Sequence, residues 1–295
     1  GGSGSLQVAA RVLKRAKEDI TVWLSDPSWP NHRPLLSSAG VALKDYPYYD
    51  PTTHAVDFGA MTSALDLAKP GNAVLIHGCC HNPCGADLSH DHWRALTEQL
   101  NQRQLIPFID LAYQGLGDGL DEDAFGLRYM AEHCPEVVIA SSASKNFGLY
   151  RERIGGLTFV TPSADQSERV RSHGTSVARG LYSLPPSHGG ALVGTILADP
   201  ELNREWRQEL AEVRDRINGM RAALAAALRD AVGDGRFDFV TQHRGMFSFL
   251  GLSAAQVDTL KQDHAIYMVS SSRINVAGLT PSNVGYVAEA IAAVI

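Results

Sequence analysis

The chain is organised around one stretch of its sequence, Val137-Val138-Ile139-Ala140-Ser141-Ser142-Ala143-Ser144-Lys145-Asn146-Phe147-Gly148-Leu149-Tyr150-Arg151-Glu152-Arg153. The four apolar residues at its start predict a buried strand, which delivers a lysine and several hydroxyl groups to the loop that follows. A lysine that is partly desolvated among small residues has a lowered pKa, so its amine is available for Schiff-base chemistry. Arg153 could hold an anion nearby. The alternative is that Lys145 is a solvated surface lysine.

Composition narrows the classes of function. The chain has 295 residues, of which 44% are hydrophobic and 20% charged, which is ordinary for an enzyme with one large or two modest domains. Its net charge of -6 includes no block rich in lysine or arginine, which argues against a nucleic-acid partner. No apolar run is long enough to span a membrane. Four cysteines make no disulfide framework in a chain of this length, so we expect a cytoplasmic protein without a membrane partner.

Short apolar segments alternate with helical patterns from the start of the chain to the lysine loop. Strands are predicted at residues 20–24, 41–46, 73–76, 105–109 and 137–140. This alternation predicts an α/β fold, in which a mostly parallel central sheet is flanked by helices and binds ligands at the carboxyl ends of its strands. Trp29, Asn82, Asp110 and Lys145 each follow a predicted strand, so we expect them to share one rim of the sheet.

The pattern changes after Pro200, where apolar residues recur at alternating steps of four and three positions up to Leu224. This spacing predicts one long helix that ends near Val232. A coiled-coil seam would give the same spacing, but the run is short and favours a core helix that crosses between two domains. Further strands are predicted at 237–240, 246–250 and 265–269. We therefore expect a large domain over residues 1–212 and a smaller α+β domain over residues 213–295.

The first five residues, GGSGS, have the composition of a flexible linker. They run directly into an apolar stripe of helical spacing formed by Leu6, Ala9, Leu13 and Ala16. The free backbone N–H groups of a glycine-rich helix start suit a phosphate. Composition alone leaves both interpretations open.

A cluster of thiols and imidazoles invites comparison with a zinc site. It consists of His77, Cys79, Cys80, His81 and Cys84. Two of the cysteines are adjacent and no second ligand pair follows elsewhere in the chain, so we favour small buried thiols and expect no metal.

The glycines at positions 115, 117 and 119 suggest a dinucleotide-binding loop. Their spacing differs from the G-x-G-x-x-G pattern, and the acidic residues at 118 and 121–123 would repel a pyrophosphate. We therefore interpret the segment as a solvated turn.

Asp110 closes an apolar strand, where burial would raise its pKa unless a cation or hydrogen bonds keep it ionised. A protonated ring nitrogen would be such a cation. Tyr113 and Asn82 could then reach an oxygen of the same ring, and Trp29 could stack on its face. Ordinary packing explains each residue alone, but together with the lysine loop they describe a site for a phosphorylated pyridine aldehyde.

Six segments carry a resemblance to a known family. They are PSWPNH at 27–32, HGCCHNPCG at 77–85, DLAYQG at 110–115, SKNFGLYRER at 144–153, GMFSF at 245–249 and RINVAG at 273–278. On these segments the chain resembles, from Gly1 to Ile295, the fold-type I aspartate and aromatic amino acid aminotransferases of class I, which depend on pyridoxal 5'-phosphate. The resemblance implies transfer of the amino group of an aromatic or acidic L-amino acid to a 2-oxo acid such as 2-oxoglutarate.

The resemblance also implies roles in catalysis and in cofactor binding. The catalytic residues would be Lys145, Asp110, Tyr113 and Trp29. Lys145 would carry the cofactor and later move a proton at the substrate α-carbon, while Asp110, supported by His32, would keep the ring nitrogen protonated. The cofactor-binding residues would be Gly2, Ser3, Trp29, Asn82, Asp110, Tyr113, Ser142, Lys145 and Arg153. The phosphate would lie against Gly2, so the resemblance favours the phosphate interpretation of the glycine-rich start.

The substrate-binding residues implied by the resemblance are Arg273, Arg179, Asn82, Trp29 and Phe247. Arg273 would bind the α-carboxylate in a bidentate pair. Arg179 matches an arginine that binds a side-chain carboxylate in the active site of the partner subunit, so we expect a homodimer with shared active sites. Leu184 stands where the family usually has an asparagine, and an apolar residue there suits aromatic substrates.

The sequence leaves two further hypotheses about the function open. The first is a different pyridoxal-phosphate reaction on the same scaffold, such as β-elimination or decarboxylation, since fold does not fix chemistry. The second follows from the length of the family, whose members carry a further N-terminal segment before the position matched by Gly1. This second hypothesis is that the chain is an inactive fragment with a binding or structural role.

Overall fold

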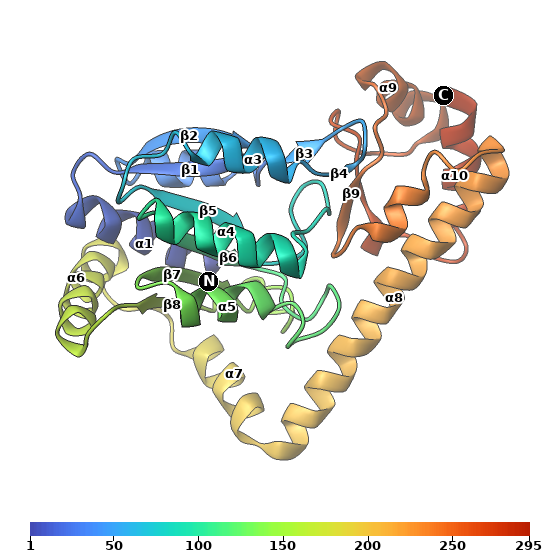
Figure 1. The fold of residues 1–295 in the computed structure, drawn as a ribbon. Coiled ribbons are helices and arrows are strands. Elements are labelled where there is room, and N and C mark those ends of the chain that lie inside the picture. The colour runs from blue at the N-terminus through green and yellow to red at the C-terminus, as the bar shows by residue number, and fades with distance from the viewer.

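The computed structural model describes residues 1–295, and its largest feature is a six-stranded sheet (Figure 1). Its strands are β1 (Thr21–Asp26), β2 (Ala42–Pro47), β5 (Ala73–His77), β6 (Ile106–Leu111), β7 (Val137–Ser142) and β8 (Gly155–Val160). The strand order is β2-β1-β5-β6-β7-β8, and every neighbouring pair is parallel except β7 and β8. The predicted α/β fold with a mostly parallel sheet is confirmed.

Helices cover both faces of this sheet, as Figure 1 shows. The covering helices are α1 (Gly2–Ala16), α2 (His32–Ser37), α3 (Phe58–Leu65), α4 (His90–Gln102), α5 (Phe125–His133) and α6 (Ala164–Tyr182). Successive strand residues point to opposite faces, and the central strands β5, β6 and β7 are buried along almost their whole length, so both of their faces are covered. Leu75 and Phe108 pack with α1 and α2, whereas Ile76 and Ile109 pack with α3 and α4. The strand ends are thereby fixed from both sides.

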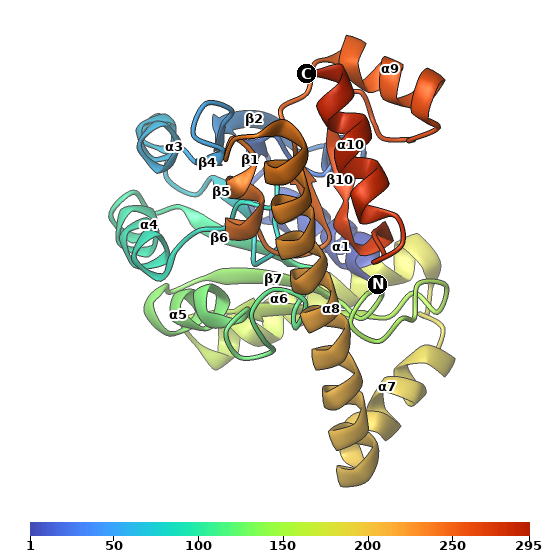
Figure 2. The ribbon, with the colours of Figure 1, turned by 90° about the vertical axis from the view of Figure 1, so that its right-hand side faces the viewer.

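A long helix links the sheet to the C-terminal part of the chain. After α7 (His188–Ala198), helix α8 (Pro200–Val232) runs diagonally away from the sheet and packs against α10 (Val284–Val294) (Figures 1 and 2). The predicted long helix is confirmed. Its buried residues Leu210 and Leu224 join a core that also contains Leu111 and Tyr113 from the strand end. The expected boundary at residue 212 lies inside this helix.

The C-terminal part corrects two strand predictions. Residues 237–240 do not form a strand, because the 3-10 helix η1 (Asp238–Gln242) occupies this segment. Residues 265–269 have no strand either, since Ala265 takes a left-handed backbone conformation (φ 50°) that ends α9 (Ala254–His264). Ile266 and Met268 instead pack as coil against the core. The two strands here are β9 (Phe247–Phe249) and β10 (Arg273–Asn275), which pair in antiparallel fashion.

Smaller elements complete the chain. They are the two-residue strands β3 (Tyr49–Asp50) and β4 (Ala55–Val56) and the 3-10 helix η2 (Val276–Gly278). No helix combines the length and apolar character needed to cross a membrane.

Candidate active site

A cavity of about 210 Å³ lies at the carboxyl ends of the parallel strands. Its lining includes all nine residues predicted to bind a cofactor: Gly2, Ser3, Trp29, Asn82, Asp110, Tyr113, Ser142, Lys145 and Arg153. They come from the start of α1, from the last residues of β6 and β7, and from the segments that follow β1, β5, β6 and β7. The rim expected from the order of strands and polar residues is therefore present.

Asp110 lies at the end of β6 and is buried. Its Oδ2 atom is 2.8 Å from Nε2 of His32, whose Nδ1 is 2.9 Å from Oγ of Ser28. Burial would raise the pKa of Asp110, but the hydrogen bond with His32 and the charge of Lys145 hold the pKa below its ordinary value. The cavity therefore contains a carboxylate that stays ionised without a direct lysine or arginine partner.

Lys145 follows β7 and is partly buried in the cavity wall. Its Nζ atom lies 4.6 Å from the centre of the Tyr113 ring. Burial lowers the pKa of this amine; Asp110 opposes the shift and Arg153 adds to it. The solvated-lysine alternative therefore does not describe this side chain, because part of its hydration is replaced by the cavity wall.

The glycine-rich start of the chain forms the first turn of α1 and closes one end of the cavity. The linker interpretation is therefore wrong for residues 2–5. A Cβ atom on Gly2 would lie 3.1 Å from Cβ of Ser142, so only glycine leaves this space free. Serine hydroxyls, the N-terminus of a helix and the guanidinium of Arg153 make up a donor set that fits a phosphate.

Arg273 and Phe247 approach the rim from the β9–β10 strand pair. Nη1 of Arg273 donates to Oδ1 of Asn82 at 3.0 Å, and its guanidinium lies 4.5 Å from the centre of the Phe247 ring. Asn82 Nδ2 in turn lies 3.5 Å from the hydroxyl of Tyr113. Arg179 is exposed on α6 and does not line the cavity, so within one chain the structure does not bring it to the other predicted residues.

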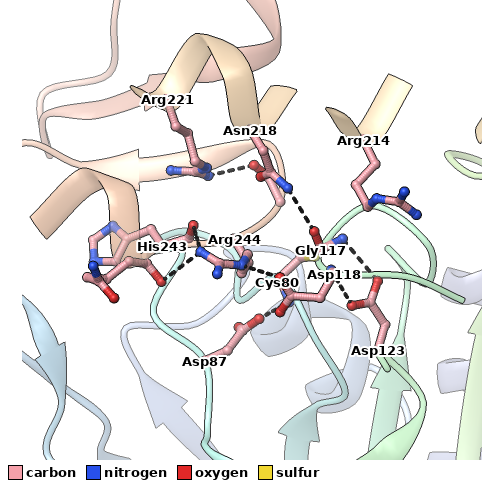
Figure 3. Close-up of polar contacts among 12 residues, drawn as sticks. Cys80, Asp87, Gly117, Asp118, Asp123, Arg214, Asn218, Arg221, His243 and Arg244 are labelled. Atoms are coloured by element: carbon pink, nitrogen blue, oxygen red, sulfur yellow. Dashed lines mark hydrogen bonds and ion pairs between the residues drawn. The ribbon is translucent and has the colours of Figure 1, made fainter. Parts of the chain in front are cut away.

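The glycine loop after β6 is mostly buried, so the prediction of a solvated turn is wrong. Asp123 explains the difference, because its carboxylate accepts the backbone N–H groups of Gly115, Gly117 and Asp118 at 2.8, 2.9 and 2.8 Å. Figure 3 shows Asp123 beside Gly117 and Asp118. Asp118 alone points outward, where it pairs with Arg244 at 2.7 Å. One buried carboxylate therefore organises the whole loop.

The cysteines are unpaired and buried, as the sequence predicted for the thiols. Cys79, Cys80 and Asp123 bring three potential metal ligands within 4.8 Å of one another. The carboxylate oxygens of Asp123, however, already accept three backbone N–H groups. His81 lies outside this group, with Nδ1 3.1 Å from Sγ of Cys84. The group therefore fits a structural role for Asp123 better than a metal centre.

Beyond the nine predicted cofactor-binding residues, the lining contains Leu6, His77, Ala112, Ser144 and Tyr150. Ser144 and Tyr150 belong to the lysine loop, so their proximity to Lys145 in the sequence was the available signal. His77 ends β5 beside Asp110 and could have been found from the strand pairing. Leu6 carried no signal beyond its place in the apolar stripe of α1.

Comparisons with known proteins agree with this geometry. The family described as "Aminotransferase class I and II" matches residues 1–291. The chain is 44% identical over 295 residues to the aspartate aminotransferase of Haemophilus influenzae, covering 100% of this chain and 74% of that protein. It is 46% identical over 291 residues to the aromatic-amino-acid aminotransferase of Paracoccus denitrificans, covering 99% and 74%. The crystal structure of the aromatic-amino-acid aminotransferase from Burkholderia pseudomallei, covalently bound to pyridoxal phosphate, superposes with a TM-score of 0.98 at 46% identity and covers 100% of this chain and 74% of that one.

Proposed function

Because the chain belongs to the class I and II aminotransferases, we propose that it moves the amino group of an aromatic or acidic L-amino acid to a 2-oxo acid such as 2-oxoglutarate. The chain is an aminotransferase, and its cofactor is pyridoxal 5'-phosphate. The observation that carries the proposal is that the partly buried Lys145 and the ionised Asp110 line one cavity together with the phosphate cradle. We use this name for the donor set formed by Gly2, Ser3, Ser142 and Arg153.

Lys145 acts in this proposal through its amine. Pyridoxal 5'-phosphate, when bound, supplies a ring that draws electrons away from the α-carbon of the amino acid. Burial lowers the pKa of Lys145, so a larger fraction of the amine is unprotonated near neutral pH and able to bind the cofactor. The amine of Lys145 would also be placed to take a proton from the α-carbon of the bound amino acid and to hold it for return to the product.

Asp110 and its neighbours orient the cofactor ring. The carboxylate of Asp110 would accept a hydrogen bond from the protonated ring nitrogen, and His32 keeps that carboxylate in place. Asn82 and Tyr113 would hold the ring oxygen, and Trp29 would cover one face. The phosphate would take hydrogen bonds from Ser3, Ser142, Arg153 and the first turn of α1, with space supplied by Gly2.

Arg273 would bind the α-carboxylate of the substrate. Its guanidinium is held between the Asn82 amide and the Phe247 ring, which leaves part of its planar fork for a bidentate pair. Such a pair fixes the orientation of the α-carbon relative to Lys145.

A homodimer with shared active sites accounts for the positions of Arg179 and Leu184. Arg179 is exposed and is not part of the cavity lining of its own chain, and Leu184, five positions later in the sequence, is 82% exposed. In the dimer both would reach the partner's site, where Leu184 would contact an aromatic side chain and Arg179 a carboxylate. We also propose a cofactor-binding domain over residues 1–212, a small domain over residues 213–295 and, from four unpaired cysteines, a cytoplasmic location.

The test is a comparison of phenylalanine, tyrosine and aspartate as amino donors, with 2-oxoglutarate as acceptor and Lys145→Ala as the control variant. Production of glutamate from all three donors supports the proposal. Negligible activity with phenylalanine and tyrosine would contradict the proposal that the enzyme accepts aromatic amino acids. Product formed in the absence of any 2-oxo acid would point to elimination or decarboxylation instead.

A further inference from the structure

Arg221, outside the cavity, fixes the backbone next to β9. It lies on α8, is only 1% exposed, and its Nη2 atom donates to the carbonyls of Gly245 and Phe247 at 2.5 and 2.8 Å. Its Nη1 atom donates to Oγ of Ser248 at 2.6 Å. A guanidinium holds its donors in a rigid plane, so these bonds determine the path of residues 245–248. Arg221 therefore sets the position of β9.

Asp87 has a corresponding function in the loop that carries Asn82. Its Oδ2 atom accepts the N–H of Cys80 at 2.7 Å, and its Oδ1 atom accepts the N–H of His81 at 2.8 Å. Cys80 has a left-handed backbone (φ 52°), a conformation that residues other than glycine rarely adopt. The two hydrogen bonds stabilise this unfavourable turn directly before Asn82.

The two loops touch along their backbones. The N–H of Arg244 donates to the carbonyl of Gly85 at 2.8 Å. A Cβ atom on Gly245 would lie 2.3 Å from Cβ of Cys80, and one on Gly85 would lie 2.3 Å from the carbonyl oxygen of Phe247. Glycine is required at both contacts because no side chain fits between the loops. A displacement of one loop therefore moves the other.

We propose that Arg221 and Asp87 are positioning residues for the substrate carboxylate, because they fix the two loops that bring Arg273 and Asn82 together. Arg273 lies on β10, which pairs with β9, and its guanidinium covers the ring of Phe247. Asn82 accepts the hydrogen bond of Arg273 from the other loop. The inference rests on the proposed role of Arg273 in binding the α-carboxylate.

The charge of Asp87 is consistent with this role. Burial raises the pKa of Asp87 to about 6, against the lowering effect of its backbone hydrogen bonds and of Arg221. At neutral pH the carboxylate is therefore mostly ionised, so both N–H groups meet a charged acceptor. Hydrogen bonds to an ionised acceptor are stronger than those to a neutral one.

The test uses the full chain loaded with pyridoxal 5'-phosphate and the probe 3-phenylpropionate, which is phenylalanine without its amino group and cannot react. The dissociation constant of the probe is measured by titration calorimetry for Arg221→Gln, with Arg229→Gln as the matched control on the same helix. Arg229 is exposed and pairs with Asp238. We expect Arg221→Gln to weaken probe binding by about tenfold, while the visible band of the bound cofactor and the control stay as in the parent chain.

Asp87→Asn is compared in the same way with Asp91→Asn, since Asp91 is exposed and pairs with Arg94. We expect Asp87→Asn to raise the KM for phenylalanine more than it lowers kcat, and the double variant Arg221→Gln/Asp87→Asn to lose less than the product of the single losses. If Arg221→Gln fails to fold, Arg221→Lys, which keeps the charge without the planar fork, should show the same weakening.

Parental probe affinity in Asp87→Asn and in the folded Arg221 variant would overturn the inference. In that case the proposed function would still stand if the parent chain binds the cofactor and converts phenylalanine. A parent chain that binds no cofactor would instead contradict the proposed function itself.

Discussion

Arg273 and Asn82 are 191 positions apart in the sequence and meet through a hydrogen bond of 3.0 Å between Nη1 and Oδ1. Asn82 follows a strand of the large sheet, whereas Arg273 belongs to the strand pair at the far end of α8. In the proposed function this contact would join the part of the chain that holds the cofactor to the part that holds the substrate carboxylate. The orientation of the substrate relative to Lys145 would then depend on how the two parts pack.

Arg273→Lys tests the role of the guanidinium. Lysine keeps the charge but makes no bidentate pair, so we expect the KM for the amino acid to rise by about tenfold or more. Steady-state kinetics with phenylalanine and 2-oxoglutarate measure this change. Arg236→Lys is the control, because Arg236 is exposed and pairs with Asp234. Equal KM values for the two variants would contradict the proposed role of Arg273 in binding the substrate carboxylate.

Gly2→Ala tests the phosphate cradle. The added Cβ atom would lie 3.1 Å from Cβ of Ser142 and intrude on the cavity, so we expect the affinity for pyridoxal 5'-phosphate to fall by about tenfold. Gly4→Ala is the matched control, since its Cβ atom would meet nothing within 4 Å. Equilibrium dialysis of the cofactor measures both affinities. A loss of the same size at Gly4 would indicate an effect on the helix and not on the cavity.

Asp123→Ala tests what organises the glycine loop. The variant leaves the N–H groups of Gly115, Gly117 and Asp118 without their acceptor, so we expect the free energy of unfolding to fall by about 3 kcal/mol. Urea unfolding followed by circular dichroism gives this value. Asp121→Ala, at an exposed position in the same segment, should change it by less than about 0.5 kcal/mol. Similar losses in both variants would argue against the loop arrangement.

Asp87 gives the stability of the chain a defined pH dependence. Its pKa is raised from 3.8 to about 6 in the folded chain, so the folded state binds the proton more tightly than the unfolded state. The stabilisation that protonation provides is fully present below pH 3.8 and is lost as the pH rises through about 6. The free energy of unfolding of the parent chain, measured relative to Asp87→Asn, should therefore fall over this window. A difference that does not change with pH would contradict the raised pKa.

The strand ends of the large sheet, and with them most of the site, could be predicted from the sequence. Asp110 and Lys145 each follow an apolar run, and parallel strands bring their carboxyl ends to one edge. The helical start of the chain was harder to predict, because the composition of GGSGS fits a linker as well as a helix start. The resemblance to a known family decided between the two.

Other features gave no usable signal. Asp123 stands beside Asp121 and Glu122, and nothing in the sequence distinguishes the buried carboxylate from its exposed neighbours. Arg221 lies in a helix rich in charged residues, where its burial depends on the distant segment 245–248. The strand 273–275 is too short for a periodic pattern, whereas the longer apolar run at 265–269 packs as coil. These features arise from tertiary contacts, which local patterns do not encode.

The most direct measurement is the visible absorption spectrum after addition of pyridoxal 5'-phosphate to the parent chain, Lys145→Ala and the control Lys261→Ala. Lys261 is exposed in the last turn of α9. We predict that the band of the cofactor bound covalently to an amine develops in the parent and in Lys261→Ala and is absent from Lys145→Ala. A band that persists in Lys145→Ala, or no band in the parent chain, would contradict the assignment of the site.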